Sequence, residues 1–221
     1  MPTLPADGTP LRHLAVIPDG NRRWARARGL GPEDGHRAGI ANVGETARAA
    51  FASGIETFSF WWGSPANLTK RDAAEVRGIV GVLETWLAEV APALCAEADA
   101  RVEVIGRWRE LCPSLEPAIE ALPTHGTRHL VLFMAYDGRE EIRAAAESDM
   151  SFEDALWTAH LPPVDLLIRT GGDAHFSAGF LLWKLAQAQL AFPDELWPAY
   201  GRACLERDLD TFARTQRRFG R

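Results

Sequence analysis

The chain has 221 residues, of which 47% are hydrophobic and 24% charged, a composition typical of a globular protein and unlike that of a disordered chain. Its formal net charge of −6 argues against a nucleic-acid-binding protein, because such proteins are more often basic overall. The three cysteines are widely separated and form no Cys-x-x-Cys pair, which favours reduced thiols over disulfides or a zinc site.

The first dozen residues lack the apolar core of a signal peptide, and we interpret residues 1–12 as a flexible leader. No uninterrupted apolar run approaches the ~20 residues of a membrane-spanning helix. We therefore expect a cytoplasmic protein without an integral membrane segment, in which residues 13–221 form a single domain.

Apolar runs alternate with amphipathic segments along the whole chain. The first half predicts, in chain order, a strand over residues 14–17, a helix over 36–52, a strand over 55–62, a loop over 63–67 and a long helix over 72–98. Pro92 is expected to kink or split that long helix. Its apolar stripe from Val76 to Leu94 is either hydrophobic core or, with Trp61 and Trp62 opposite, one wall of an apolar tunnel.

The second half predicts strands over residues 102–105, 130–135 and 164–168 and helices over 138–147, 180–190 and 205–218. This alternation indicates an α/β fold, a single domain with a central, mostly parallel sheet flanked by helices. Ligands of such sheets bind at the carboxyl ends of the strands. Three predicted strand ends carry polar clusters here, over residues 19–24, 63–67 and 169–177.

The first cluster combines a carboxylate, a glycine turn and two arginines, in the order Asp19, Gly20, Asn21, Arg22 and Arg23. Backbone N–H groups and arginine forks are typical ligands of phosphate groups. A carboxylate beside a phosphate site is favourable when it holds a Mg²⁺ ion that also contacts the phosphates. A simple turn with solvated arginines would have the same composition.

The third cluster, which follows an almost purely apolar strand, contains Arg169, two glycines and Ser177. It suits a second anionic group, although a β–α loop with a structural arginine is the alternative. The C-terminal residues Arg217-Arg218-Phe219-Gly220-Arg221 form a basic tail.

Four segments together resemble the cis-prenyltransferases, the family of undecaprenyl diphosphate synthase. They are, in the family's order, HLAVIPDGNRRW, SPANLTKRDAAEV, VDLLIRTGGDAHFSAGFLLWKLAQAQLAFPDELWP and the terminal RRFG. The resemblance extends from His13 to the C-terminus and implies one α/β domain that pairs as a homodimer, binds Mg²⁺ and joins isoprenoid diphosphates.

The resemblance also implies roles for individual residues. Asp19 would be the Mg²⁺-linked catalytic aspartate, and Asn67 and Arg23 would act with it on the donor. The donor diphosphate would be bound by Gly20, Asn21, Arg22, Arg23, His36, Ser64 and Arg71. The acceptor diphosphate would be bound by Arg169, His175 and Ser177, together with Arg218 and Gly220 of a second subunit.

Several family positions are changed in this chain. Ala66 replaces a loop glutamate of the family, and Leu68 replaces a tryptophan. Pro32 stands at the position of an arginine, and Gln189 at that of a metal-binding glutamate. The segment after Asp173 has one extra residue, so that His175 replaces either an arginine or a histidine of the family.

Because most of these changes fall on the acceptor and metal side, we expect an irregular enzyme of the lavandulyl type. Such an enzyme joins geranyl diphosphate to dimethylallyl diphosphate in a head-to-middle bond. Three alternatives remain: head-to-tail elongation with isopentenyl diphosphate, a non-catalytic subunit of a heteromeric enzyme, and a diphosphate-binding module without turnover.

Overall fold

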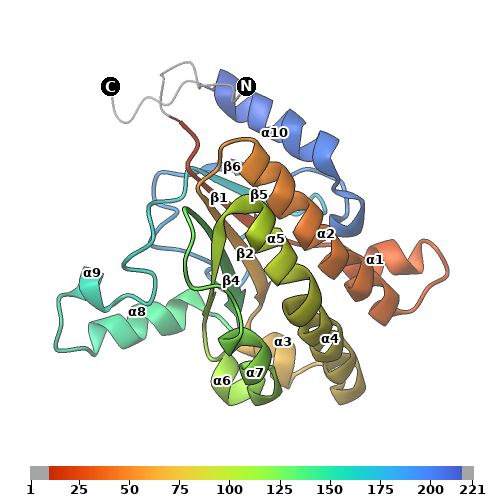
Figure 1. Cartoon of the computed structure of the whole chain (residues 1–221), viewed down its shortest axis with the longest axis horizontal. Coiled ribbons are helices and arrows are strands. Elements are labelled where there is room, and N and C mark those ends of the chain that lie inside the picture. Colours follow the sequence, from red (N-terminus) through yellow and green to blue (C-terminus); the bar gives the residue numbers. More distant parts are fainter. Residues whose placement is uncertain (1–9, 216–221) are drawn as a thin grey trace.

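The computed structural model describes residues 10–215, in which six strands form one central sheet (Figure 1). The strands are β1 (His13–Ile17), β2 (Thr57–Gly63), β3 (Ala100–Ile105), β4 (Arg128–Met134), β5 (Leu166–Arg169) and β6 (Gln189–Ala191). Their order across the sheet is β3-β4-β2-β1-β5-β6, and every pairing is parallel. The predicted α/β class with a parallel sheet is confirmed.

The central strands form because their side chains are apolar and covered on both faces, as parallel strands require. All five residues of β1 are buried, and so are the last six residues of β4. β1 lies between β2 and β5, so the carboxyl ends of these three strands are neighbours. The three predicted polar clusters follow these three ends.

Helices cover one face of the sheet, where α2, α4 and α5 lie side by side (Figure 1). The helices are α1 (Asn21–Arg26), α2 (Pro32–Ala52), α3 (Pro65–Thr69), α4 (Ala73–Thr85), α5 (Ala91–Ala98), α6 (Trp108–Leu111), α7 (Glu116–Glu120), α8 (Gly138–Ala146), α9 (Phe152–Ala155) and α10 (Arg202–Arg214). The larger apolar core lies between this face and the helices and includes Val43 of α2, Leu83 of α4 and Phe58 of β2.

Helix boundaries differ from the prediction where the sequence contains caps. α2 begins four residues early, because Pro32 suits a first helical position and the Asp34 carboxylate accepts a hydrogen bond from the Gly31 N–H at 3.2 Å. Part of the predicted 63–67 loop is the short helix α3, which Ser64 caps and Pro65 begins. The last helix ends at Arg214 within the described residues.

The long predicted helix is continuous from Ala73 to Ala98 but contains a π turn over Trp86–Val90. The Ala91 N–H donates to the Trp86 carbonyl, five residues back, instead of four. The wider turn immediately precedes Pro92, which has no N–H and would crowd the carbonyl four residues before it. The proline therefore alters the helix where the sequence predicted, without splitting it.

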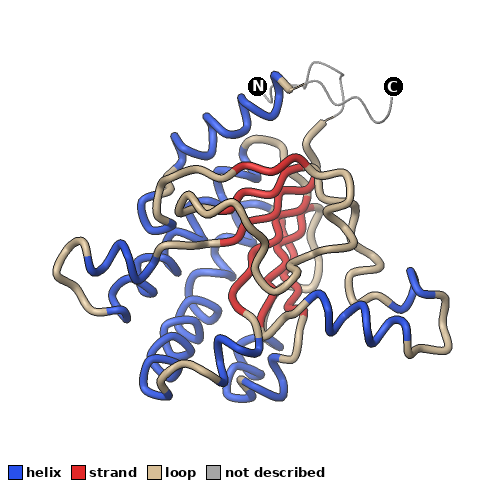
Figure 2. Tube along the Cα trace, turned by 180° about the vertical axis from the view of Figure 1, so that it is seen from behind, coloured by secondary structure: helices blue, strands red, loops and turns tan. Residues whose placement is uncertain are grey.

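The other face is covered largely by irregular chain, which crosses the sheet as tan loops in Figure 2. The predicted helix over residues 180–190 is wrong. Ala178, Gly179 and Leu181 have positive φ angles of 47°, 58° and 49°, which interrupt helical hydrogen bonding. Phe180 and Leu181 are fully buried against this face, so their apolar character reflects burial under a sheet. The last residues of the predicted helix form β6 instead.

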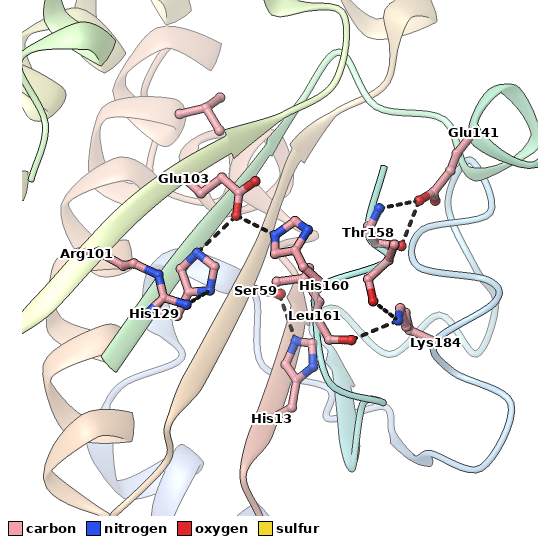
Figure 3. Close-up of polar contacts among 12 residues, drawn as sticks. His13, Ser59, Arg101, Glu103, His129, Glu141, Thr158, His160, Leu161 and Lys184 are labelled. Atoms are coloured by element: carbon pink, nitrogen blue, oxygen red, sulfur yellow. Dashed lines mark hydrogen bonds and ion pairs between the residues drawn. The ribbon is translucent and has the colours of Figure 1, made fainter. Parts of the chain in front are cut away.

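Polar side chains hold parts of this irregular cover together and tie it to the sheet (Figure 3). The Lys184 ammonium donates to the carbonyls of Ala159 at 3.1 Å and Leu161 at 2.8 Å. On β3, the Glu103 carboxylate lies 2.8 Å from His160 Nε2 and 3.1 Å from His129 Nε2. These contacts lie away from the carboxyl ends of the strands, and we interpret them as structural.

One helix within residues 10–215, Ala73–Ala98, is long and apolar enough to cross a membrane by length and composition alone. Our sequence reading of uninterrupted apolar runs did not anticipate this. About two fifths (39%) of its most hydropathic window is buried inside the protein, and Leu83, Leu87 and Leu94 belong to the core. The helix packs as one layer of the fold, and the cytoplasmic location stays a prediction. The predicted leader also stays a prediction, since only residues 10–12 of it are described.

Candidate active site

Asp19 and Arg169 lie together where β1 and β5 end. The parallel register pairs Ile17 with Arg169, and Arg169 Nη2 donates to Asp19 Oδ2 at 2.8 Å. Thr170 fixes the same turn, because the Asp19 N–H donates to Thr170 Oγ1 at 2.9 Å and the Thr170 hydroxyl donates to the Asp19 carbonyl at 2.8 Å. The first and third predicted clusters therefore form one site.

A second guanidinium reaches the same carboxylate. Arg23 Nη2 lies 3.3 Å from Asp19 Oδ1, and Arg23 Nη1 donates to the Gly171 carbonyl at 3.0 Å. The Asp19 side chain is 30% exposed, whereas that of Arg169 is 4% exposed. Two cations around one partly exposed anion leave a net positive charge, which favours an anionic ligand.

Arg169 also fixes the segment that follows it. Its Nη1 donates to Ser177 Oγ at 2.6 Å and to the backbone carbonyl of His175 at 3.0 Å. Its Nε is buried and has no hydrogen-bond partner among the described residues. The His175 side chain is exposed, so within this chain only its backbone contributes to the contact.

Glycines allow the two turns to approach each other closely. Gly20 has a φ of +110°, and a Cβ there would lie 2.7 Å from Leu196 Cδ2. Gly171 has a φ of +89°, and a Cβ there would lie 2.4 Å from Arg23 Nη2. Both backbone conformations are ones that side-chain-bearing residues rarely adopt.

A cleft opens beside this site, between α2 and β2, with about 500 Å³ of empty space including its open mouth. Four predicted site residues line it: Asn21, His36, Asn67 and Arg71. The rest of its lining is mainly apolar and comes from Pro18, Gly39, Ile40, Val43, Phe60, Trp61, Trp62, Ile79 and Trp197. A polar end joined to apolar walls suits an amphiphilic ligand.

Ser64 and Asn67 are held to each other at the end of β2. The Ser64 N–H and hydroxyl both donate to Asn67 Oδ1, at 2.9 and 3.0 Å, and the Asn67 N–H donates to Ser64 Oγ at 3.3 Å. With its oxygen occupied in this way, the Asn67 amide presents its NH₂ group as a hydrogen-bond donor. Within this chain Ser64 therefore positions Asn67.

A second, more apolar cavity continues from the cleft, and the two share Trp62, Asn67, Arg71 and Ile79. Its remaining lining consists of Gly63, Leu68, Val76, Val80, Leu83, Cys112, Met134 and Ala135. The beginning of the predicted apolar stripe thus lines a cavity, together with Trp62. Trp86, Leu87 and Leu94, farther along the stripe, are buried in the core.

The polar end of the cleft carries two basic groups whose proton affinity is reduced. Burial lowers the pKa of the Arg71 guanidinium and that of the His36 imidazole. For His36 the positive charge of Arg71 lowers the pKa further, since like charges disfavour protonation. Both effects favour the neutral imidazole.

The structure thus gathers the predicted residues into two adjoining groups. Arg23 and Arg169 contact Asp19, Gly20 follows it and Ser177 binds Arg169, while the cleft is lined by Asn21, His36, Asn67 and Arg71. Arg22 is largely exposed and faces Glu75, with 3.8 Å between Arg22 Nε and Glu75 Oε1. Arg218 and Gly220 lie outside the described residues.

Two residues were missed by the sequence reasoning. Thr170 locks the Asp19 turn, and Glu75 lies against His36. Both stand inside the motifs that were singled out, RTGG and DAAEV, but neither has a pattern that distinguishes it from an ordinary strand-end or helix residue. Their partners are more than 35 residues away in sequence, so only the fold brings them together.

Among residues 10–215, no group of three or more His, Cys, Asp or Glu side chains could hold a metal ion by itself. Asp19 supplies one partly exposed carboxylate beside the cationic site, which fits Mg²⁺ shared between a single carboxylate, ligand phosphates and water. Gln189 begins β6 opposite Leu166, three residues before Arg169, so in one chain it lies toward the other end of the sheet from Asp19.

Comparison with known proteins is consistent with these features. A sequence model of the family described as "Putative undecaprenyl diphosphate synthase" matches residues 17–220. Proteins named isoprenyl transferase include one from Zymomonas mobilis that is 35% identical over 229 residues, 95% of this chain and 91% of its own length. Another, from Thermus thermophilus, is 35% identical over 235 residues, 95% of this chain and 89% of its own. A crystal structure of lavandulyl diphosphate synthase from Lavandula x intermedia in complex with dimethylallyl diphosphate matches with a TM-score of 0.86. It is 30% identical and covers 95% of this chain and 98% of that one.

Proposed function

Because this chain belongs to the undecaprenyl diphosphate synthase-like cis-prenyltransferase family and is an enzyme that transfers prenyl groups, we propose that it catalyses an irregular condensation. The donor would be geranyl diphosphate and the acceptor dimethylallyl diphosphate, joined head to middle into a branched diphosphate of the isosesquilavandulyl type. The observation that carries this proposal is the likeness to a lavandulyl diphosphate synthase over nearly the whole chain. The changes at Ala66 and Gln189 support it.

The donor would place its diphosphate at the polar end of the cleft and its prenyl tail along the apolar walls. Arg22, Arg23 and the Gly20–Asn21 turn would bind the diphosphate, and His36, Asn67 and Arg71 would contact it from the cleft side. As the allylic C–O bond breaks, negative charge builds on the leaving diphosphate. Preorganised guanidinium and amide donors lower the barrier by stabilising that charge. Ser64 would act by orienting Asn67.

Asp19 is the residue that would hold Mg²⁺, which when bound supplies further stabilisation of diphosphate charge. The Asp19 carboxylate pairs with Arg169 and Arg23. An acceptor diphosphate at Arg169 would take over part of that pairing and leave the carboxylate available. Ser177 and His175 would complete the acceptor site, with Arg218 and Gly220 contributed by a second subunit.

The dimer that this arrangement needs is supported by exposed apolar side chains. Phe176, Leu182, Trp183 and Leu190, all between 41% and 45% exposed, belong to the segment that follows the acceptor site. Met150 is 61% exposed and lies two residues from Phe152, which packs on Trp183. We infer a homodimer that buries this surface. A monomeric mass by light scattering at working concentrations would contradict it.

A second function has its own support. The relatives named isoprenyl transferase are more similar in sequence than the lavandulyl enzyme, and their name favours head-to-tail elongation with isopentenyl diphosphate. The non-catalytic readings are less well supported, because Asp19, Arg23 and Arg169 are all present and in contact.

Product analysis separates the candidates. The purified full chain with Mg²⁺ receives geranyl diphosphate plus either dimethylallyl or isopentenyl diphosphate, and the dephosphorylated alcohols are identified by mass spectrometry against standards. We expect a branched alcohol from dimethylallyl diphosphate. A linear cis product that requires isopentenyl diphosphate would establish elongation instead. No product from either acceptor, with the donor diphosphate still bound, would favour a binding module or a partner subunit.

A further inference from the structure

A buried His–Glu pair lies at the polar end of the cleft. His36 Nε2, on α2, is 3.4 Å from Glu75 Oε1, on α4, and the two side chains are 11% and 14% exposed. Neither atom has a hydrogen-bond partner among the described residues. The buried Asn21 Oδ1 also lacks one there. Burying unpartnered polar atoms is costly, and the Glu75 oxygen can only accept a hydrogen bond, so a donor on the facing imidazole would satisfy it.

The backbone fixes the position of Glu75. It lies in the first turn of α4, where the Asp72 carboxylate caps the helix by accepting hydrogen bonds from the N–H groups of Ala74 at 2.8 Å and Glu75 at 3.2 Å. The Glu75 carboxylate therefore points at the imidazole from a rigid element.

The charged groups that face His36 come from three elements. Arg22 of α1 and Arg71, just before α4, oppose protonation of the imidazole, and Glu75 of α4 favours it. On α2 itself, Glu33 and Arg37 pair with each other at 3.1 Å and are largely exposed. Burial and the two guanidiniums prevail, so that the pKa of His36 lies below its ordinary value.

We infer that Glu75 is a positioning residue whose carboxylate prepares His36 to take up a proton when the donor diphosphate binds. This inference rests on the proposed function, which places the diphosphate in this cleft. A diphosphate adds several negative charges near the imidazole, and nearby negative charge favours its protonated form. The imidazolium carries a proton on both ring nitrogens, and its Nε2 lies 3.4 Å from the Glu75 carboxylate, which is therefore placed to accept from the charged ring. Without Glu75, the imidazolium would lose the carboxylate that offsets the positive charges of Arg22 and Arg71.

Isothermal titration calorimetry tests this directly. The unreactive donor analogue geranyl S-thiolodiphosphate is titrated into the full-length protein in two neutral buffers of different ionisation enthalpy, which yields the protons exchanged on binding. We expect net uptake by the wild type, and clearly less uptake by His36→Gln and by Glu75→Gln. Glu75→Asp should retain part of it. Glu33→Gln is the matched control and should behave as wild type, since Glu33 is exposed and pairs with Arg37.

The pH dependence of affinity gives a second readout. From about pH 8 to about pH 6, affinity should rise more steeply in the wild type than in His36→Gln. The rise in affinity of the wild type should exceed that of His36→Gln by a factor that reaches about tenfold for each pH unit by which bound diphosphate raises the pKa of the imidazole. Protonation of the analogue itself is common to all variants and cancels in the comparison.

The outcomes separate the two proposals. If the wild type binds the analogue tightly but exchanges the same number of protons as His36→Gln, the role of the pair is overturned. The proposed function would still stand in that case. Reduced uptake in His36→Gln but not in Glu75→Gln would overturn the role of Glu75. No binding of the analogue in any buffer would contradict the proposed function itself.

Discussion

His13 should make the protein sensitive to mild acid. The side chain is fully buried at the start of β1, with Nδ1 2.9 Å from the Pro162 carbonyl and Nε2 2.8 Å from Ser59 Oγ (Figure 3). A carbonyl only accepts hydrogen bonds, so the neutral ring carries its proton on Nδ1 and accepts the Ser59 hydroxyl proton at Nε2. Burial lowers the pKa of His13 from 6.5 to about 4, which means that folding favours the neutral ring.

The direction in which His13 changes the folding stability with pH follows from proton linkage. Between the two pKa values the unfolded chain binds more protons than the folded one, so the contribution of His13 is complete above pH 6.5 and is lost as the pH falls to about 4. At about 1.4 kcal/mol for each pH unit, the loss amounts to about 3 kcal/mol, a large share of the stability of a domain.

Urea unfolding of wild type and His13→Gln across this pH range measures the effect. Other titrating groups are common to both proteins and cancel in the difference. We expect the wild type to lose about 3 kcal/mol relative to the variant on acidification, whatever offset the substitution causes at neutral pH. Parallel stability curves for the two proteins would refute the assignment of a buried neutral histidine.

Three further predictions concern the site. Gly171→Ala should destabilise the protein by about 1–3 kcal/mol in urea, because of its positive φ and the close approach of Arg23, whereas Gly81→Ala, in open space on α4, should stabilise it slightly. Arg169→Lys should lower kcat/KM by at least about tenfold in steady-state assays, since one ammonium replaces a guanidinium that contacts both Asp19 and Ser177. Arg23→Ala should lower turnover more than melting temperature, and normal turnover per folded molecule would contradict its role at the leaving group.

The sequence predicted the fold class and most strands because these depend on local signals. β1 and β4 are continuous apolar runs with polar residues at their ends, and buried parallel strands have that pattern. The predicted helix over residues 180–190 was wrong for a related reason. An apolar run buried beneath a sheet has no periodicity that excludes a helix, and the left-handed conformation of Leu181 is set by tertiary packing.

The site residues were predicted from motifs, but their pairing was not. The contact between Asp19 and Arg169 depends on β1 and β5 being neighbours in register, and 150 residues separate the two positions. The same holds for His36 and Glu75, which meet only because α2 and α4 pack side by side. Composition and spacing indicate which chemistry is present, whereas the sheet order decides which charges face each other.

The two groups of site residues share a single turn, and this has a consequence for the order of events. Asp19 ends the turn on the side of Arg169, and Asn21 continues it into the cleft. The Asp19 carboxylate pairs with Arg169, so that an acceptor diphosphate, as proposed, would compete with it for the guanidinium. A diphosphate that wins this competition frees the carboxylate beside the donor cleft. Under the proposed function, occupation of the acceptor site would therefore release Asp19, whose neighbours Pro18 and Asn21 line the cleft, and would couple the two sites through this turn.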